Sequence, residues 1–296
     1  MAWEYDGARL WHSYYSDARV IWEMLRPPAL RYRELAFVFR EGPEGYRKRA
    51  FRGRVAIKPR ALRHWLKKFL CREDFRRIPC DVFMGIRRAR RGYGPSSRAV
   101  IPPNRLEYWG YDVVIEIDGT GPTREQQLES AYEAARRIKE ILDTLEAPYA
   151  LVFSGGRGFH IWFLWEHLRA FFTEEAWPGV FRLSLVPWLA GEAGVPMNVI
   201  DTSQFAPHGL IRVWYSVHPL TGLVCLPLTD AQFDNFTPDL ALPHRVLALP
   251  RLGQRGPLVR SQDRSLEPLV LRWLRGAPPW LRPSAREVPL ISQASR

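Results

Sequence analysis

The chain has 296 residues, 46% of them hydrophobic and 13% aromatic, so it is long and apolar enough to fold around a sizeable core. Its 43 lysines and arginines against 31 acidic residues leave a net charge of +12. This charge is typical of proteins that bind nucleic acid, but it is equally compatible with an enzyme that is merely rich in arginine. Its three cysteines form no zinc or disulfide pattern and no apolar run approaches the roughly 18 residues of a membrane span, so we expect a cytoplasmic protein that does not bind membranes.

The first part of the chain predicts one helix, three strands and a second helix. Apolar residues at helical spacing predict a helix over 8–26, which ends before two prolines. Short apolar runs predict strands at 33–39, 46–51 and 80–86. A basic helix is predicted at 58–70 between the second and third of these strands.

The segment RRARRGYGPSSR at 87–98 is dense in arginine, glycine and serine, and we predict a loop there. Such a loop is either an ordinary solvated segment or an arm that contacts the phosphates of nucleic acid without reading its sequence. The arginines expected to bind nucleic acid in this way are Arg49, Arg87, Arg88, Arg90 and Arg91.

The stretch YDVVIEIDGTGPT at 111–123 predicts a strand with an acidic end. Side chains alternate between the two faces of a strand, so Glu116 and Asp118 are expected on one face. Asp201 follows another apolar run and supplies a third carboxylate. The alternative is a set of surface carboxylates paired with some of the many arginines. Clustered carboxylates beside a phosphate-binding loop are, however, typical of two-metal nucleotidyl transfer.

A helix is predicted from a capping box at Thr123 and Gln126 to about Leu145. Two strands follow, at 151–153 and 161–165, and the turn between them contains three glycines. A tight hairpin needs fewer residues of positive φ, so this turn is expected to leave backbone N–H groups open to phosphate oxygens.

The remainder predicts a helix at 181–194 interrupted at Pro187, a short strand at 198–204 and a longer strand at 209–217. From Cys225 onward prolines are frequent, and the expectation is a loop-rich tail with a final helix at 265–275.

Three stretches together resemble the motifs of archaeo-eukaryotic primases, in the same order and at suitable spacing. They are EID at 116–118, SGGRGFH at 154–160 and IDTSQFAPHGLIRVWYSVHPLTGL at 200–223. The nearest likeness is to the catalytic small subunit of archaeal and eukaryotic DNA primase. RELAF at 33–37 and PCDVFMGIRR at 79–88 resemble the N-terminal blocks of that family more loosely.

The resemblance implies a role for each matched residue. Glu116, Asp118 and Asp201 match the catalytic carboxylates that hold two Mg²⁺ or Mn²⁺ ions. A second set matches positions that contact the incoming NTP or dNTP, with the loop backbone contributing: Ser154, Gly155, Gly156, Arg157, His160, Arg212 and His218. Each of these side chains also has an ordinary structural interpretation as a turn, loop or buried residue.

The chain departs from the family pattern in two places. Glu116 stands where aspartate is usual, which lengthens one metal ligand by a methylene group. The segment 161–200 contains no cysteine, so the zinc module of the small subunits is not expected. The implied fold is α+β, a primase catalytic core with an RRM-like mixed or antiparallel sheet flanked by helices. We expect an N-terminal α/β half at 1–110, a catalytic half at 111–245 and a C-terminal extension at 246–296.

The resemblance implies a DNA primase or primase-polymerase that makes short RNA or DNA strands on single-stranded or primed DNA. Two alternatives remain open, a gap-filling polymerase of end joining and a non-catalytic nucleic-acid-binding subunit. The partner protein is equally open between a primase large subunit, a helicase and a repair factor.

Overall fold

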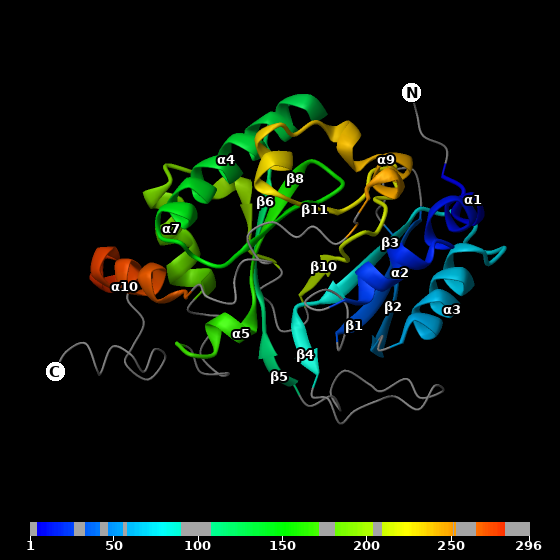
Figure 1. The fold of residues 1–296 in the computed structure, drawn as a ribbon, viewed down its shortest axis with the longest axis horizontal. Helices are drawn as coiled ribbons and strands as arrows, with labels where there is room; N and C mark the ends of the chain where they lie inside the picture. The colour runs from blue at the N-terminus through cyan, green and yellow to red at the C-terminus, as the bar shows by residue number, and fades with distance from the viewer. Residues whose placement is uncertain are drawn as a thin grey trace.

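The structure is a computed structural model that describes residues 5–26, 33–41, 47–55, 58–89, 108–171, 181–203, 209–250, 252 and 265–281. Within these ranges the chain forms two larger antiparallel sheets, of four and five strands, and a separate two-stranded sheet, all flanked by helices (Figure 1). The predicted α+β class is therefore confirmed. None of the helices in these ranges is long and apolar enough to cross a membrane.

The first sheet has four strands in the order β10-β3-β1-β2. Their bounds are Leu210–Arg212 (β10), Cys80–Gly85 (β3), Glu34–Glu41 (β1) and Arg47–Val55 (β2). The central strands β1 and β3 are almost wholly buried, as their apolar runs predict. The edge strand β10 comes from the expected second half of the chain and pairs with the expected first half, so the two halves share a sheet.

The second sheet has five strands in the order β11-β7-β8-β6-β9. Their bounds are Leu226–Leu228 (β11), Ala150–Phe153 (β7), Gly158–Phe163 (β8), Val113–Asp118 (β6) and Ile200–Asp201 (β9). Strands β7 and β8 form the predicted hairpin, and the predicted succession of strand, long helix, strand, glycine turn and strand is confirmed.

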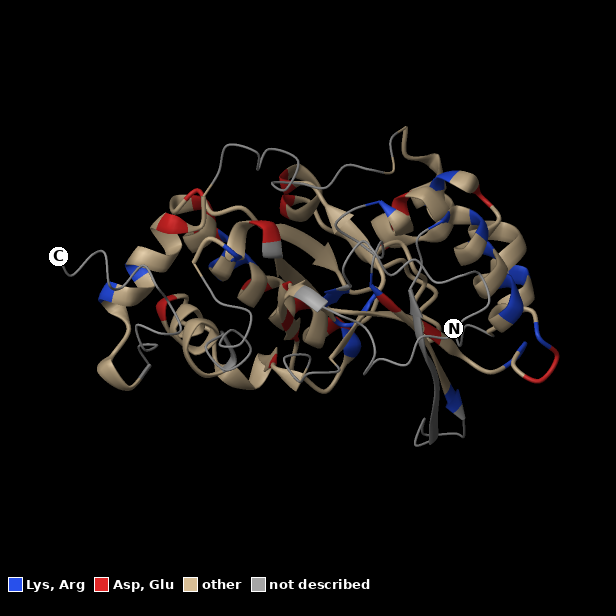
Figure 2. Ribbon diagram, turned by 90° about the horizontal axis from the view of Figure 1, so that it is seen from below, with Lys and Arg blue, Asp and Glu red and all other residues tan. Residues whose placement is uncertain are grey.

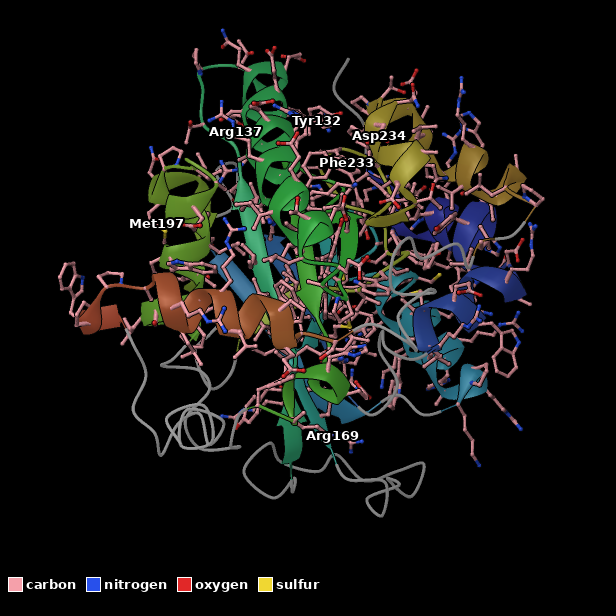
Figure 3. All side chains as sticks on the ribbon, turned by 60° about the vertical axis from the view of Figure 1, so that its left-hand side comes forward. Tyr132, Arg137, Arg169, Met197, Phe233 and Asp234 are labelled. Carbon is pink, nitrogen blue, oxygen red and sulfur yellow. The ribbon has the colours of Figure 1, made fainter. Side chains whose placement is uncertain are left out.

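The long helix α4 (Arg124–Thr144) begins at the predicted capping box, in which Thr123 and Gln126 satisfy each other's backbone N–H groups. It covers the outer face of the second sheet (Figure 1). Its Tyr132 packs 4.8 Å from Phe233 of α8 (Asp230–Asp234), ring centroid to ring centroid, and Figure 3 shows these two rings together.

The N-terminal helices cover the other sheet. They are α1 (Gly7–Leu10), a π-helical turn at Trp11–Tyr15, α2 (Ala18–Leu25) and α3 (Pro59–Leu70). The remaining helical segments are α5 (Trp165–Leu168), a π-helical turn at Phe181–Leu185, α7 (Val186–Glu192), α9 (Pro243–Ala248), α10 (Glu267–Gly276) and the 3₁₀ turns Met197–Val199, Pro238–Ala241 and Pro279–Leu281.

Several predicted boundaries were wrong for identifiable reasons. The first helix is broken because Asp17 caps a new helix and accepts the N–H of Arg19 at 2.7 Å. The strand predicted at 209–217 ends at Arg212 because Tyr215 adopts a φ of 65° in a turn. Residues 87–89, predicted as loop, form strand β4 (Arg87–Ala89), which pairs with β5 (Tyr108–Tyr111).

One further segment differs from its predicted form and another agrees with it. Among the described residues of the predicted strand at 198–204, which end at Ser203, Ile200 and Asp201 form strand β9, and a 3₁₀ turn precedes them. Of the helix predicted at 181–194, Phe181–Leu185 form a π-helical turn and the α-helix α7 begins only at Val186, which agrees with the predicted interruption at Pro187. Pro187 lies in the first turn of α7, where its missing N–H costs no hydrogen bond.

The inner faces of the two sheets carry polar side chains. In β1, Phe37 and Phe39 contact Phe69 of α3 at 4.4 and 6.2 Å between ring centroids, so Arg40 lies on the opposite face. In β8, Phe159 contacts Tyr132 of α4 at 6.1 Å, so the next residue, His160, faces away from α4. The outer faces are thus apolar and covered by helices, which leaves the inner faces for a site.

Candidate active site

Three carboxylates lie on neighbouring strands of the second sheet. Glu116 of β6 is directly opposite Asp201 of β9, and Asp118 is two residues further along the same face. The side chains of Glu116 and Asp118 are 24% and 29% exposed, so both reach solvent. The strand register therefore brings together the three acids that the sequence singled out.

The guanidinium of Arg157 lies among these carboxylates. Its Nη2 and Nε donate to Oδ2 of Asp118 at 2.9 and 3.3 Å. The pKa of Arg157 is raised, chiefly by the hydrogen bond to Asp118 and also by the charges of Glu116 and Asp201. All three acids consequently act on one cationic group at the end of the glycine loop.

His160 is the buried polar residue of the site. It is directly opposite Glu116 across the β6–β8 pair and is 1% exposed. Its Nε2 is 3.6 Å from Oε1 of Glu116, too long for a hydrogen bond, and neither ring nitrogen has a hydrogen-bond partner among the described residues. A buried imidazole without a partner is costly, so a polar ligand that reached it would be bound favourably.

The glycine loop is held by Ser154. Its Oγ accepts the N–H groups of Gly156 at 3.1 Å and of Gly158 at 3.3 Å. These two N–H groups are therefore engaged within the loop, which differs from the open backbone that the sequence predicts. In this arrangement these two amides are therefore not open to a phosphate oxygen.

Glycine is required at this turn for two different reasons. Gly155 has a φ of 78°, a conformation that other residues rarely adopt. A Cβ at Gly158 would lie 1.9 Å from the carbonyl oxygen of Ile117, so strand β8 can approach β6 only without a side chain there.

The turn at residues 218–223 closes over the loop. The hydroxyl of Thr221 donates to the carbonyl of Gly155 at 2.6 Å, and His218 lies beside Gly156. The N–H of Leu220 donates to Nδ1 of His218 at 3.2 Å, which places the proton of the neutral ring on Nε2, the nitrogen toward Gly156. Burial, reinforced by the charge of Arg212, lowers the pKa of His218 to about 3.

We expect His218 to make stability depend on pH. The unfolded chain binds a proton at this residue below about pH 6.5 and the folded protein does not, so the free energy of unfolding falls as the pH drops from 6.5 toward 3. The loss from this residue is at most about 1.4 kcal/mol per pH unit. Urea unfolding at pH 7 and pH 4.5 should show a smaller difference for His218→Asn than for the unchanged protein. Equal differences in the two proteins would contradict the assignment.

Arg212 is fixed by an acid that the sequence analysis did not select. Asp81 of β3 is buried and forms an ion pair with Arg212 of β10, while its Oδ2 accepts from Nε of Arg40 at 2.8 Å. The charges of Arg212 and Arg40 lower the pKa of Asp81 against the opposing effect of burial. The guanidinium carbon of Arg212 lies 5.1 Å from the ring centroid of Phe83. A signal for Asp81 was available, because a lone aspartate within the apolar run CDVFMG requires a cationic partner.

Arg88 was predicted to bind nucleic acid, and the structure places it elsewhere. Its side chain is 8% exposed, and it forms ion pairs with Asp112, at 3.0 Å, and with Glu166. Asp112 also pairs with the fully buried Arg33, which donates to the carbonyl of Ile86 at 3.0 Å. The guanidinium of Arg88 is thus part of a buried network and is not presented to a phosphate backbone.

The structure describes the other arginines that were expected to bind nucleic acid only in part. Arg87 of β4 is half-buried, with its guanidinium carbon 5.2 Å from the ring centroid of Tyr111. Arg49 lies in β2, but its side chain is outside the described part of the chain. Arg90 and Arg91 lie outside the described residues altogether.

The acidic set suits a hard divalent cation by its chemistry, because carboxylate oxygens are the ligands that Mg²⁺ and Mn²⁺ prefer. In the arrangement seen, however, no group of three or more His, Cys, Asp or Glu side chains among the described residues is close enough to hold a metal ion. Asp118 is turned toward Arg157, and Oδ1 of Asp201 accepts the N–H of Ser203 at 2.7 Å. A cation bound by all three acids would therefore compete with Arg157.

Comparison with known proteins found a likeness among solved structures and none among families or curated proteins. No protein-family model matches the sequence, and no curated protein matches it. Among solved structures the chain is similar to the polymerase domain from Mycobacterium tuberculosis Ligase D in complex with DNA. The two are 17% identical, the match covers 94% of this chain and 99% of the other, and the TM-score is 0.49.

Proposed function

We propose that this protein is a template-directed nucleotidyltransferase of the primase or primase-polymerase type. It would transfer a nucleoside monophosphate from an NTP or dNTP to a 3′-hydroxyl on a DNA template. Pyrophosphate would leave. The proposal combines the primase-like motifs of the sequence with the positions of the same residues on the second sheet, at its glycine loop and on the neighbouring strand β10 of the first sheet.

One observation carries the proposal. Glu116 stands in register between Asp201 on one side and, on the other, the imidazole of His160, which has no hydrogen-bond partner in the described part of the chain. The site thus offers carboxylates for cations and, one strand away, a buried group able to donate to an anion. A metal-bound nucleoside triphosphate has both of these features, whereas a purely structural cluster has no use for an unpartnered buried histidine.

The residues divide by charge into two groups. Glu116, Asp118 and Asp201 would hold two Mg²⁺ or Mn²⁺ ions, which neutralise triphosphate charge and acidify the attacking hydroxyl. The donors to phosphate oxygens would be His160, Arg157 and Nε2 of His218. The positive charge of Arg212 would add to the attraction for the phosphates. Arg157 would leave Asp118 for the triphosphate when the cations are present. Ser154 would act mainly by keeping the loop in shape.

Two other functions fit the site less well. A metal-dependent nuclease would use the carboxylates, but it has little need for the cationic groups gathered at the glycine loop. A non-catalytic subunit would have no reason to keep three carboxylates in register beside that loop.

The decisive experiment is incorporation of labelled NTPs and dNTPs on single-stranded DNA, with and without an annealed primer, in Mg²⁺ and in Mn²⁺. Products without a primer are expected if the protein starts strands. Products that require a primer would favour the gap-filling alternative within the same chemistry. Absence of product with either metal and either nucleotide would refute the proposed reaction.

A further inference from the structure

Helix α3 presents a continuous basic face to solvent. Four of its apolar residues are buried, Leu62, Leu66, Phe69 and Leu70, and Ala61 and Trp65 are half-buried. The exposed residues of the helix and its N-cap include Lys58, Arg60, Arg63, His64, Lys67 and Lys68. No acidic residue occurs in the helix. Figure 2 shows basic positions recurring along the helices at the right-hand side of the molecule.

This face lacks the charge balance of the other long helix. On α4, Arg136 and Arg137 both pair with Glu133 at 2.8 Å, and Lys139 pairs with Asp143 at 2.6 Å. On α3, no ion pair to a carboxylate involves Arg60, Lys67 or Lys68 within the described ranges. Like charges on one helix face repel each other and destabilise the helix. If α3 only had to remain soluble, acidic residues among its basic ones, as on α4, would make the helix more stable.

An exposed aromatic side chain lies on the adjoining helix. Trp22 of α2 is 61% exposed, and α2 packs against α3. A cationic surface beside an exposed aromatic ring is the combination that binds single-stranded nucleic acid, because the cations contact phosphates and the ring stacks on a base.

We infer that the exposed face of α3, together with Trp22, is a second binding surface for single-stranded nucleic acid. The inference rests on the proposed function, because the strand it would hold is the template that extends beyond the site. Helix α3 covers the outer face of the first sheet, whereas the carboxylates lie on the inner face of the second sheet. A nucleic-acid strand can therefore contact both only if it runs around an edge of the first sheet. Only a long strand can therefore bind the site and this surface at the same time.

An anionic membrane is the other polyanion to consider. A helix that lies on a membrane exposes several large apolar side chains beside its basic ones. In α3 the apolar stripe is instead buried, with Phe69 against Phe37 and Phe39. The exposed side is charged, so nucleic acid fits it better.

The test compares oligo-dT of about 8 and about 40 nucleotides, lengths that match one binding site and several. The variant is Arg60→Gln/Lys67→Gln/Lys68→Gln. The control is Arg137→Gln/Arg169→Gln/Arg272→Gln, which removes the same charge from exposed positions on other elements; Figure 3 labels the first two. Binding is measured by fluorescence anisotropy over a salt series, without nucleotide or divalent metal.

The α3 variant should bind the long strand on the order of tenfold more weakly, with a salt slope smaller by about 2, because three phosphate contacts are lost. Its affinity for the short strand should be unchanged, and the control should retain the long-strand affinity. Trp22→Ala should weaken long-strand binding without changing the salt slope, because stacking releases no counterions.

Equal losses in the control and the α3 variant would overturn the inference in favour of net charge alone. Unchanged long-strand binding, or a loss confined to binding of phosphatidylserine vesicles, would also overturn it. Nucleotide incorporation on a short primed template separates this inference from the proposed function. Its absence in the unchanged protein would refute the reaction, whereas the binding results above decide the surface.

Discussion

Asp118→Asn is expected to lower nucleotide incorporation by at least ~100-fold, the scale of losing one preorganised charge at a reacting centre. Asparagine keeps the size of the side chain but removes the negative charge that both Arg157 and a divalent cation require. The measurement is the initial rate of incorporation at saturating nucleotide and metal. The fold should survive, because the Asp118–Arg157 pair is partly exposed and such pairs contribute about 1 kcal/mol or less.

Asp234→Asn is the matched control for this experiment. Asp234 is an exposed carboxylate on α8, labelled in Figure 3, and its replacement should leave the rate unchanged. A rate for Asp118→Asn within a few-fold of the unchanged protein would mean that Asp118 is a surface acid paired with an arginine. Circular dichroism and thermal unfolding of both variants would show that any loss is not a loss of fold.

Asp112→Asn is expected to lower the free energy of unfolding by about 3–5 kcal/mol, the cost of leaving a buried charge without its partner. Asp112 and Arg33 are both fully buried, and Arg88 shares the same carboxylate. Burial already lowers the pKa of Arg33 from its ordinary value, and Asp112 is the largest influence opposing that shift. Guanidinium-induced unfolding at neutral pH measures the effect.

Glu166→Gln tests the same network from its exposed end. Glu166 pairs with Arg88 but its side chain is 43% exposed, so water can replace the interaction and the expected loss is below about 1 kcal/mol. Similar losses for the two variants would show that burial does not set the strength of this network. A small loss for Asp112→Asn would show that Arg33 finds compensation elsewhere.

The same network explains how the two sheets are held together. Arg33 immediately precedes β1 of the first sheet, and Asp112 immediately precedes β6 of the second. The carbon Cζ of Arg33 also lies 5.7 Å from the ring centroid of Trp162 in β8, whose ring is 5.2 Å from that of Trp214. A change in this network should therefore affect the distance between the inner faces as well as stability.

Local sequence patterns predicted the elements that depend on neighbours along the chain. The apolar periodicity and capping box of 123–145 anticipated α4, and the period-2 alternation of 113–118 placed Glu116 and Asp118 on one face. The glycine turn was also predictable, because glycine readily adopts the positive φ that Gly155 has in this turn. These features follow from backbone geometry and short-range hydrogen bonds.

Local patterns were least reliable where a distant partner decides the outcome. The strand β4 within the predicted arginine loop exists because β5, some twenty residues later, pairs with it. The role of Ser154 was also reached only through the fold, because its hydroxyl accepts the loop amides that the sequence suggested were open to a ligand.

By itself, the sequence determined the α+β succession of elements, the acidic pair of one strand and the chemical character of the glycine loop. Only the tertiary structure decided which charges meet. It placed Asp201 beside Glu116, paired Arg212 with Asp81 and buried Arg88 with Asp112. It also left His160 without a hydrogen-bond partner among the residues that the structure describes. The physical reason is that a charged side chain takes its role from its partners and its exposure to water, and both are set by strands that are far apart in the chain.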